Sequence, residues 1–315
     1  MERADAAATK RVSSASHAAP RQDSTGPDVI ARATRESSPV RAAWRRFRTN
    51  RLGPVGLAIV LLLVVMAVGA PVIAPYPYDK PDFGAAWQFP SWQHPMGTDG
   101  IGRDFFSRIV YGARTSLAVG LSAQAIALTI GITLGMTAGM RGGRVDFAIM
   151  RLVDAVWAFP RMLFAIMLLT VLGSGFSNVL FAIAVTGWIP ICRLTRAQLL
   201  SQREQDYVVA ARALGASENR IARAHLLPNI LGPIIVTLTL GVAEAIFAEA
   251  GLSFLGIGIN PPIPSWGQMV GESVSTIRFY WHLALFPAVM IGLTMLGFVL
   301  LGDGLRDALD PRSKS

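Results

Sequence analysis

The chain has 315 residues, of which 52% are hydrophobic and 16% are charged, and its mean hydropathy is +0.45. Soluble domains carry about 25% charged residues, so this composition excludes a disordered chain and argues against an ordinary soluble enzyme. The net charge of +9 comes from arginines clustered between long uncharged runs. That layout suits a membrane protein better than a nucleic-acid-binding protein, whose basic residues gather on one folded face.

Neither a disulfide framework nor a metal centre is expected. The chain has a single cysteine, Cys192, which excludes an internal disulfide and a zinc site built from cysteines. The histidines never stand three or four residues apart, as two ligands on one helix face would; they are His17, His94, His225 and His282. We therefore predict no metal-binding residues.

The N-terminal part of the chain divides into a polar tail and a first membrane helix. Residues 1–40 are poor in aromatic and aliphatic side chains, and we expect them to form a disordered tail. Residues 41–75 contain a basic, aromatic segment around Trp44, expected at the membrane surface, followed by an uncharged run that starts at Leu52. That run starts too late and is too long for a signal peptide, so it predicts a retained transmembrane helix.

Five further membrane helices are expected in residues 114–303, since a helix needs about 20 residues to cross the hydrocarbon layer. Residues 162–192 are uncharged but too many for one span, and the turn-forming residues 173–178 divide the region into a hairpin. The expected spans are 115–140, about 152–173, about 178–198, 226–254 and 283–302. The predicted fold class is an all-α polytopic membrane protein with six transmembrane helices.

Basic residues indicate the orientation of these spans. With the N-terminus inside, the cytosolic segments hold 23 of the 29 Lys and Arg residues, and the outer segments hold four. The cytosolic segments are 1–52, 141–151, 193–228 and 303–315, and the outer ones are 76–113 and 256–281. Because basic loops remain on the cytosolic side, both termini are predicted to be cytosolic. Residues 76–113 then form an extracytoplasmic loop, and residues 304–315 form a cytosolic C-terminal tail.

The loop at residues 199–228, between the fourth and fifth spans, is basic yet rich in alanine. Alanine favours helix and has almost no side chain, so a short helix here could be approached closely by another protein. Gly215 is expected to end this helix, Ser217 to cap a second one, and Pro228 to mark the entry into the fifth span. The alternative is an amphipathic connector that rests on the membrane surface.

This loop resembles the EAA loop of ABC-importer permeases, the element that docks in a groove of the ATPase subunit. The resemblance rests on Ala210–Ala211, Gly215 and Leu227–Pro228. Val209 departs from the pattern where a Glu would stand, and His225 where an Ile is usual. The ATPase-coupling residues that the resemblance implies are Asp206, Tyr207, Ala210, Ala211, Gly215, Ala216, Leu227 and Pro228.

Further motifs resemble the C-type permease of dipeptide, oligopeptide and nickel importers, over about residues 41–311. They are His94–Asp99 with Gly102–Asp104, Tyr111–Leu117, Leu252–Gly256 with Pro261–Pro262 and Pro264–Gly267, and Asn50–Tyr76. The resemblance implies the type I ABC-importer permease fold, with a coupling helix pair between the fourth and fifth spans. It implies transport of di- or oligopeptides across the bacterial cytoplasmic (inner) membrane, with nickel or another small solute as the alternative.

The resemblance also implies partners. They are a homologous second permease in a heterodimer, two cytoplasmic ATPase subunits, an extracytoplasmic solute-binding protein and the lipid bilayer, with no nucleic acid. None of the chain's three lysines follows a glycine, so no phosphate-binding loop exists and the chain has no ATPase site of that kind. We expect no cofactor on this chain, and ATP and Mg²⁺ on the ATPase subunits.

Two carboxylates stand in the fifth span. Glu244 lies 15 residues past Asn229, or about 22 Å along a helix. Glu249 lies about 140° further round, so the two cannot share a face. Charges at membrane depth are costly and mark candidate sites, so we predict that Glu244 gives the translocation pathway an acidic wall. Glu249 and Trp188 are further pathway candidates. For Glu249 the alternative is packing beside Ser253, and for Trp188 it is an ordinary fourth span whose arginines reach the surface.

A pair of charges, a repeat of glycines and a group of aromatic residues are the other features of the sequence. Asp154 and Arg161 stand on one side of the predicted third span, where we expect both charges to be in contact with water. Gly131, Gly135 and Gly139 recur every four residues, which close helix packing explains. The aromatic residues of the outer loop, Trp87, Trp92, Phe105 and Phe106, are expected to be exposed for docking of a binding protein, with a lid-like role as the alternative.

Three other functions fit the residues less well. An ion-coupled secondary transporter would need coupling carboxylates and often an inverted repeat, and no clear repeat relates the two halves. A membrane hydrolase would need a nucleophile set, which Ser91, His94 and Asp99 do not indicate, and Gly-x-Ser-x-Gly is absent. A structural anchor would need neither six spans nor a small-residue loop.

Overall fold

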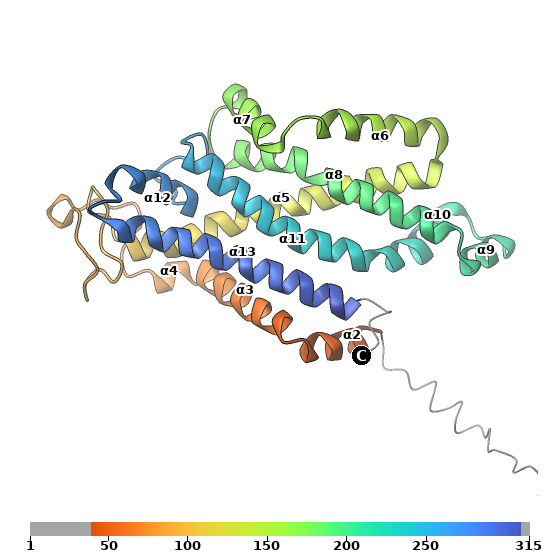
Figure 1. The fold of residues 1–315 in the computed structure, drawn as a ribbon, viewed down its shortest axis with the longest axis horizontal. Coiled ribbons are helices and arrows are strands. Elements are labelled where there is room, and N and C mark those ends of the chain that lie inside the picture. The colour runs from red at the N-terminus through yellow and green to blue at the C-terminus, as the bar shows by residue number, and fades with distance from the viewer. Residues whose placement is uncertain (1–38, 310–315) are drawn as a thin grey trace, which may run out of the picture. The chain divides into compact units, whose positions relative to one another are not determined.

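The computed structural model describes residues 39–309, and all regular elements within that range are helices (Figure 1). The predicted tail up to residue 38, and the end of the predicted C-terminal tail from residue 310, lie outside the described residues. Residues 43–309 form one compact unit. Its fold class is the predicted one, a polytopic all-α protein.

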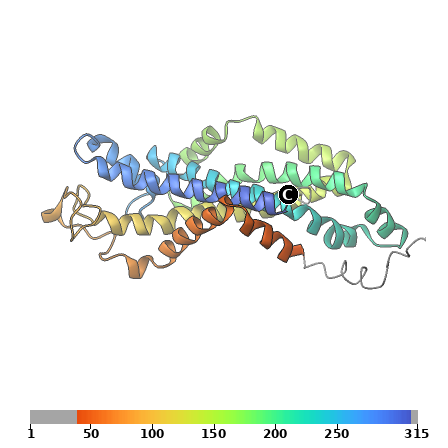
Figure 2. The same ribbon diagram turned by 60° about the horizontal axis from the view of Figure 1, so that its bottom comes forward.

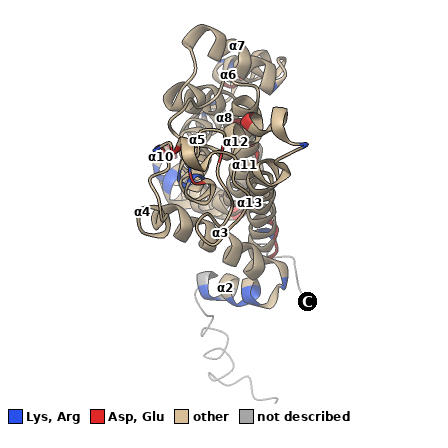
Figure 3. Ribbon diagram, turned by 90° about the vertical axis from the view of Figure 1, so that its left-hand side faces the viewer, with Lys and Arg blue, Asp and Glu red and all other residues tan. Residues whose placement is uncertain are grey.

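The chain enters the bundle through α2 (Pro39–Thr49), α3 (Leu52–Val68) and the short α4 (Ala70–Ile73). Residues 43–49 and α3 meet at 94°. At the bend, Asn50 Oδ1 accepts hydrogen bonds from the backbone N–H groups of Leu52, at 2.8 Å, and Gly53, at 3.3 Å. These bonds satisfy donors that the start of α3 leaves free. The basic residues of α2 are drawn blue in Figure 3, and Arg48 lies over the ring of Trp44.

The third span differs from the prediction. We expected one helix at about 152–173, but the chain forms α6 (Gly143–Trp157) and α7 (Arg161–Leu172), which meet at 83° (Figure 2). Pro160 explains the break, because proline lacks a backbone N–H and disfavours helical conformation in the residue before it. Asp154 and Arg161 therefore lie on separate helices, and the expectation that they share one helix side was wrong.

The remaining elements follow in order. A short turn, η1 (Phe83–Ala85), precedes α5 (Phe105–Arg141), and α8 (Phe176–Arg203) follows α7. The later elements are α9 (Asp206–Ala213), α10 (Glu218–Arg220), η2 (Ile221–Leu226), α11 (Leu227–Phe254), α12 (Trp266–Ser273), η3 (Val274–Thr276) and α13 (Trp281–Leu309). In the described part, four helices are long and apolar enough to span a membrane, or six candidate spans if each bent pair counts as one. We call the two opposite ends of the bundle the α9 end and the α12 end (Figure 1).

The fourth span, α8, is a continuous helix in spite of Pro190, and is longer than the predicted 178–198. The first two arginines of α8 pair with acidic residues of α6: Arg193 with Asp154 at 2.8 Å, and Arg196 with Asp146 at 2.5 Å. Arg193 also lies over the ring of Trp157. Both of these arginines of α8 are therefore paired with carboxylates of α6.

The glycines at 131, 135 and 139 lie where α5 packs along α8, as predicted. A methyl group added at Gly135 would stand 2.6 Å from the carbonyl oxygen of Cys192, and one at Gly131 would stand 2.7 Å from Ile191 Cβ. Small residues allow the two backbones to approach this closely. The prediction of close helix packing is confirmed.

Replacing Gly135 with valine is expected to lower the stability of the protein by about 1–3 kcal/mol, because the added side chain forces α5 away from α8. The midpoint of thermal unfolding in detergent measures this effect. Gly292→Val is the matched control: Gly292 also lies inside a long helix, but a Cβ there meets no atom within 4 Å. Equal midpoints for the two variants would contradict the packing interpretation.

Candidate functional site

The α9 end carries the loop predicted to couple to an ATPase. Helix α9 packs on the bundle through Val208, which is fully buried in a cluster with Leu199, Ile221 and Leu226. Its opposite side is open: Val209 is 55% exposed and Leu214 is 88% exposed. An apolar residue as exposed as Leu214, at the tip of a projecting helix, suits contact with another protein.

The turn after α9 has the geometry of a Schellman motif. Gly215 has a φ of +82°. Its N–H donates to the carbonyl of Arg212, and the N–H of Ala216 donates to the carbonyl of Ala211. A left-handed residue at this position favours glycine, and the two bonds satisfy carbonyl groups that the end of the helix would leave free. The predicted helix end at Gly215 is confirmed.

The second helix of the loop is shorter than expected. Ser217 caps it, as predicted, by accepting a hydrogen bond from the N–H of Arg220. Helix α10 has only three residues, and it passes through η2, a π-helical stretch that contains His225, directly into α11. The carbonyl of His225 accepts a hydrogen bond from the side chain of Asn229. The structure thus shows one separate helix, α9, followed by a continuous helical run into the fifth span.

The predicted coupling residues gather at this end, but not all on one surface. Asp206, Tyr207, Ala210, Gly215 and Pro228 are exposed, whereas Ala211, Ala216 and Leu227 are partly buried. Ala211 and Ala216 pack against the cluster around Val208. Their small size therefore serves the packing of α9 onto the bundle, and the exposed members are the ones accessible to a partner.

An ion pair joins α9 to α10. Arg212 Nε lies 2.8 Å from Glu218 Oε1, and this bond holds the pKa of Glu218 below its usual value. Because a lowered pKa favours the ionised form, the pair is present at neutral pH and is lost only as the pH falls through the lowered pKa. The pair crosses the Gly215 turn and links α9 to α10.

Replacing Glu218 with glutamine is expected to loosen α9 without unfolding the bundle, because the half-buried Arg212 loses its charged partner. Faster amide hydrogen exchange in residues 206–216 would show this. The matched control is Glu204→Gln, since Glu204 is an exposed glutamate close by in the same loop, with no ion pair in the described chain. Equal exchange in both variants would show that the ion pair does not hold the turn.

The three residues predicted to line a pathway lie in different surroundings. Trp188 is 6% exposed, and Glu249 is fully buried. Glu249 accepts hydrogen bonds from Ser253 Oγ, at 2.7 Å, and Ser116 Oγ, at 3.2 Å, so it ties α11 to α5. Only Glu244 faces out of the chain, with 61% of its side chain exposed.

Glu244 has a partner that sequence spacing did not predict. Arg161 Nη1, at the start of α7, lies 2.7 Å from Glu244 Oε2. The two residues stand 83 positions apart, and the break at Pro160 places Arg161 at the beginning of a new helix. Glu244 is therefore a carboxylate paired with a guanidinium, whereas the prediction of an acidic wall considered Glu244 alone.

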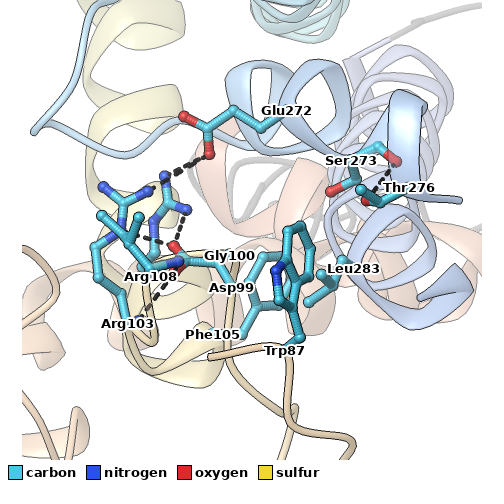
Figure 4. A pocket seen from close by; sticks show the side chains of 11 residues that line it. Trp87, Asp99, Gly100, Arg103, Phe105, Arg108, Glu272, Ser273, Thr276 and Leu283 are labelled. Carbon is cyan, nitrogen blue, oxygen red and sulfur yellow. Dashed lines mark hydrogen bonds and ion pairs between the residues drawn. The ribbon is translucent and has the colours of Figure 1, made fainter. Parts of the chain in front are cut away.

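A second charged cluster, also missed, lies at the α12 end (Figure 4). Arg108, 1% exposed, donates to Asp99 Oδ2 at 2.7 Å and lies 2.9 Å from Glu272 Oε2. Arg103 also pairs with Asp99, at 2.6 Å. The cluster borders a cavity of about 190 Å³ lined also by Trp87. Asp99 and Arg103 belong to a motif recognised in the sequence, but no local spacing pointed to Glu272 on α12.

The outer aromatic residues are only partly exposed. Trp92 is fully exposed, but Phe105 is 1% exposed in the core, and Trp87 stacks on Tyr280. The expectation that Phe105 is exposed was wrong, because it is the first residue of α5 and packs among the apolar residues below the loop.

Long apolar helices, with a helical loop projecting from one end, define a multi-spanning membrane protein. Residues 131–315 match the family described as binding-protein-dependent transport system inner membrane component, and residues 38–91 match the N-terminal transmembrane domain of oligopeptide transport permease C. The chain belongs to this family of binding-protein-dependent transport permeases.

Three relatives are similar in sequence to this chain over most of its length. The oligopeptide transport system permease protein OppC of Bacillus subtilis is 44% identical over 86% of this chain and 88% of its own length. The dipeptide permease DppC of the same organism is 45% identical over 86% and 85%. The glutathione permease GsiD of Shigella flexneri is 45% identical over 88% and 92%.

The fold is also found in a solved transporter. The inward-facing MetNI methionine ABC transporter matches 64% of this chain and 96% of its own chain, with a TM-score of 0.54 at 18% identity. At this identity the match shows the fold, which is the predicted type I ABC-importer permease fold.

Proposed function

We propose that this chain is the permease subunit of an ABC importer that takes up di- or oligopeptides. One observation carries the proposal: relatives named as dipeptide, oligopeptide and glutathione permeases are about 44% identical to it over most of its length. Glutathione is itself a tripeptide, so all three named substrates are peptides. The exposed tip of α9 supports the part of the proposal that concerns an ATPase partner.

The proposed complex contains a homologous second permease, two ATPase subunits and a solute-binding protein. ATP and Mg²⁺ bind to the ATPase subunits, since the sequence of this chain holds no phosphate-binding loop. The arginine distribution favours a cytosolic α9 end, with both termini inside, and a binding protein that docks at the α12 end. The exposed Trp92 lies on that outer side. The location is the bacterial cytoplasmic membrane.

The packing of α9 suggests how ATPase movement reaches the spans. Val208 holds α9 against Leu199 of α8 and Leu226 of η2, and the Arg212–Glu218 ion pair holds it to α10. A displacement of α9 is therefore passed to α8 and α11 together. When ATP closes the ATPase dimer, the α9 helices of the two permeases are drawn together, and the spans turn to receive solute from outside.

Reconstitution of the complex in liposomes tests this function. We expect uptake of labelled trialanine that requires ATP, Mg²⁺ and the binding protein, and that survives collapse of the proton gradient. Uptake of nickel in place of peptide would assign the alternative solute. Uptake that survives ATP removal but stops when the proton gradient collapses would overturn the ABC-importer mechanism in favour of a secondary transporter.

A further inference from the structure

The ion pair between Arg161 and Glu244 lies on an open face of the chain. Glu244 is 61% exposed and Arg161 is 34% exposed, and their charged atoms are 2.7 Å apart. Phe247, one turn further along α11, is 59% exposed. This side of α11 is therefore uncovered within the subunit.

The pair stands at membrane depth. Glu244 is ten residues before the end of α11 at Phe254, or about 15 Å along the helix. The hydrocarbon layer is about 30 Å thick, and α11 belongs to a candidate membrane span. Taking its end at Phe254 as the outer boundary of the layer places the pair inside it. Charged side chains at this depth avoid lipid and face the protein interior or a water-filled space. The uncovered face is therefore turned toward the second permease, where a solute pathway runs between two subunits.

Arg161 is held at this position by the break in the third span. Pro160 precedes it, and Arg161 is the first residue of α7. The next side chain, Met162, reaches within 2.7 Å of the place where a Cβ on Gly251 of α11 would stand. The start of α7 is thus packed on α11, and the guanidinium lies beside the carboxylate.

The chemistry of the pair matches the two ends of a free peptide. A guanidinium binds a carboxylate through two parallel hydrogen bonds, and a carboxylate accepts hydrogen bonds from an ammonium group. The two ends of an extended tripeptide lie about 10 Å apart, so the ion pair opens when a peptide enters, as the two long side chains swing apart on α7 and α11. The peptide carboxylate then takes the place of Glu244 on Arg161, and its ammonium group takes the place of Arg161 on Glu244. Each charge exchanges one partner for another, so no unpaired charge is left at membrane depth.

We propose that Arg161 and Glu244 form a bipolar recognition site in the pathway, in which Arg161 binds the carboxylate end of the peptide and Glu244 binds its amino end. The inference rests on the proposed peptide transport and adds Arg161 as a specificity-determining residue.

The test compares three probes: trialanine, N-acetyl-trialanine and trialanine amide. Uptake into liposomes by the reconstituted complex is normalised to the fraction of binding protein loaded with each probe. Arg161→Gln should lower uptake of the two probes with a free carboxylate by about 10-fold and spare the amide, because a charge-assisted hydrogen bond is lost. Glu244→Gln should lower uptake of the two probes with a free amine and spare the N-acetyl form.

The matched control is the double variant Asp154→Asn/Arg193→Gln. It removes an ion pair of the same kind from the same bent span, with exposures of 53% and 41%, and that pair joins α6 to α8. We expect its effect, whatever its size, to be equal for the three probes. Co-purification of the complex shows that each variant assembles.

Equal losses for all three probes in Arg161→Gln and Glu244→Gln would overturn the proposal, since that result marks a structural ion pair. Unchanged uptake in both variants would also overturn it. A wild-type complex that imports none of the probes from a loaded binding protein would instead refute peptide transport itself, so failure of the site and failure of the function are distinguishable.

Discussion

Replacing Gly215 with glutamate is expected to abolish the stimulation of ATP hydrolysis by loaded binding protein, while the chain still inserts and assembles. Two effects combine. The φ of +82° disfavours any residue with a side chain, at a cost of about 1 kcal/mol. The new carboxylate also projects from the exposed tip beside Leu214, where the ATPase subunit is proposed to dock. A Cβ at position 215 meets no atom within 4 Å, so the bundle itself is not disturbed.

Two variants separate these effects. Gly215→Asn keeps much of the left-handed conformation, because asparagine tolerates it better than other residues do, and should retain most of the stimulation. Gly215→Ala introduces backbone strain without charge and should fall between the two. ATPase activity of the reconstituted complex, with and without loaded binding protein, is the measurement. Normal stimulation in Gly215→Glu would remove the α9 tip from the coupling interface.

Replacing Arg108 with methionine is expected to destabilise the α12 end by about 3–5 kcal/mol, the usual cost of removing one partner from a buried ion pair. Arg108 is fully buried and bridges Asp99, in the outer loop, and Glu272, on α12. Methionine can occupy the space of the stem, but Asp99 then keeps only Arg103 as a charged partner, and Glu272 is left 3.8 Å from the same side chain. The outer loop and α12 should separate from α5.

Thermal unfolding in detergent and limited proteolysis of the outer loop measure this effect. Arg103→Met is the comparison, because Arg103 is more exposed and stands further from Glu272, and it should cost less than Arg108→Met. Adding Glu272→Gln to Arg108→Met should recover part of the loss, since it removes a carboxylate whose nearest remaining cation, Arg103, is 3.8 Å away. A larger loss of stability in Arg103→Met than in Arg108→Met would contradict this prediction, because it would make Arg103 the central residue of the cluster.

Local chemistry explains which features could be predicted from the sequence. The turn at Gly215 and the cap at Ser217 follow from residues within a few positions of one another, and both were predicted. The glycines at 131, 135 and 139 repeat with the period of one helix face, so their packing could be predicted without knowing that α8 is the partner. Each of these features depends on backbone conformation or on helical spacing.

The features that could not be predicted join distant parts of the chain. Arg161 and Glu244 are 83 residues apart, and nothing in the spacing of either span relates them. Glu272 reaches Arg108 from another helix in the same way. The break before Arg161 had a visible cause in Pro160, but residues 155–160 carry no charge. The charge pattern therefore gave no boundary there, and one span was predicted where there are two helices. Without the break, the charge partner of Glu244 could not be assigned.

Helix α5 runs through 37 residues without interruption, about 55 Å in length. One end begins beside the buried Arg108 cluster, and near the other the carbonyl of Gly139 accepts a hydrogen bond from Arg203, at the last turn of α8. A single rigid rod thus joins the two sides of the membrane, whereas the neighbouring third span is jointed at its middle. A displacement at one end of a continuous helix is carried along its axis to the other end, whereas the break at residues 158–160 interrupts such transmission along the third span.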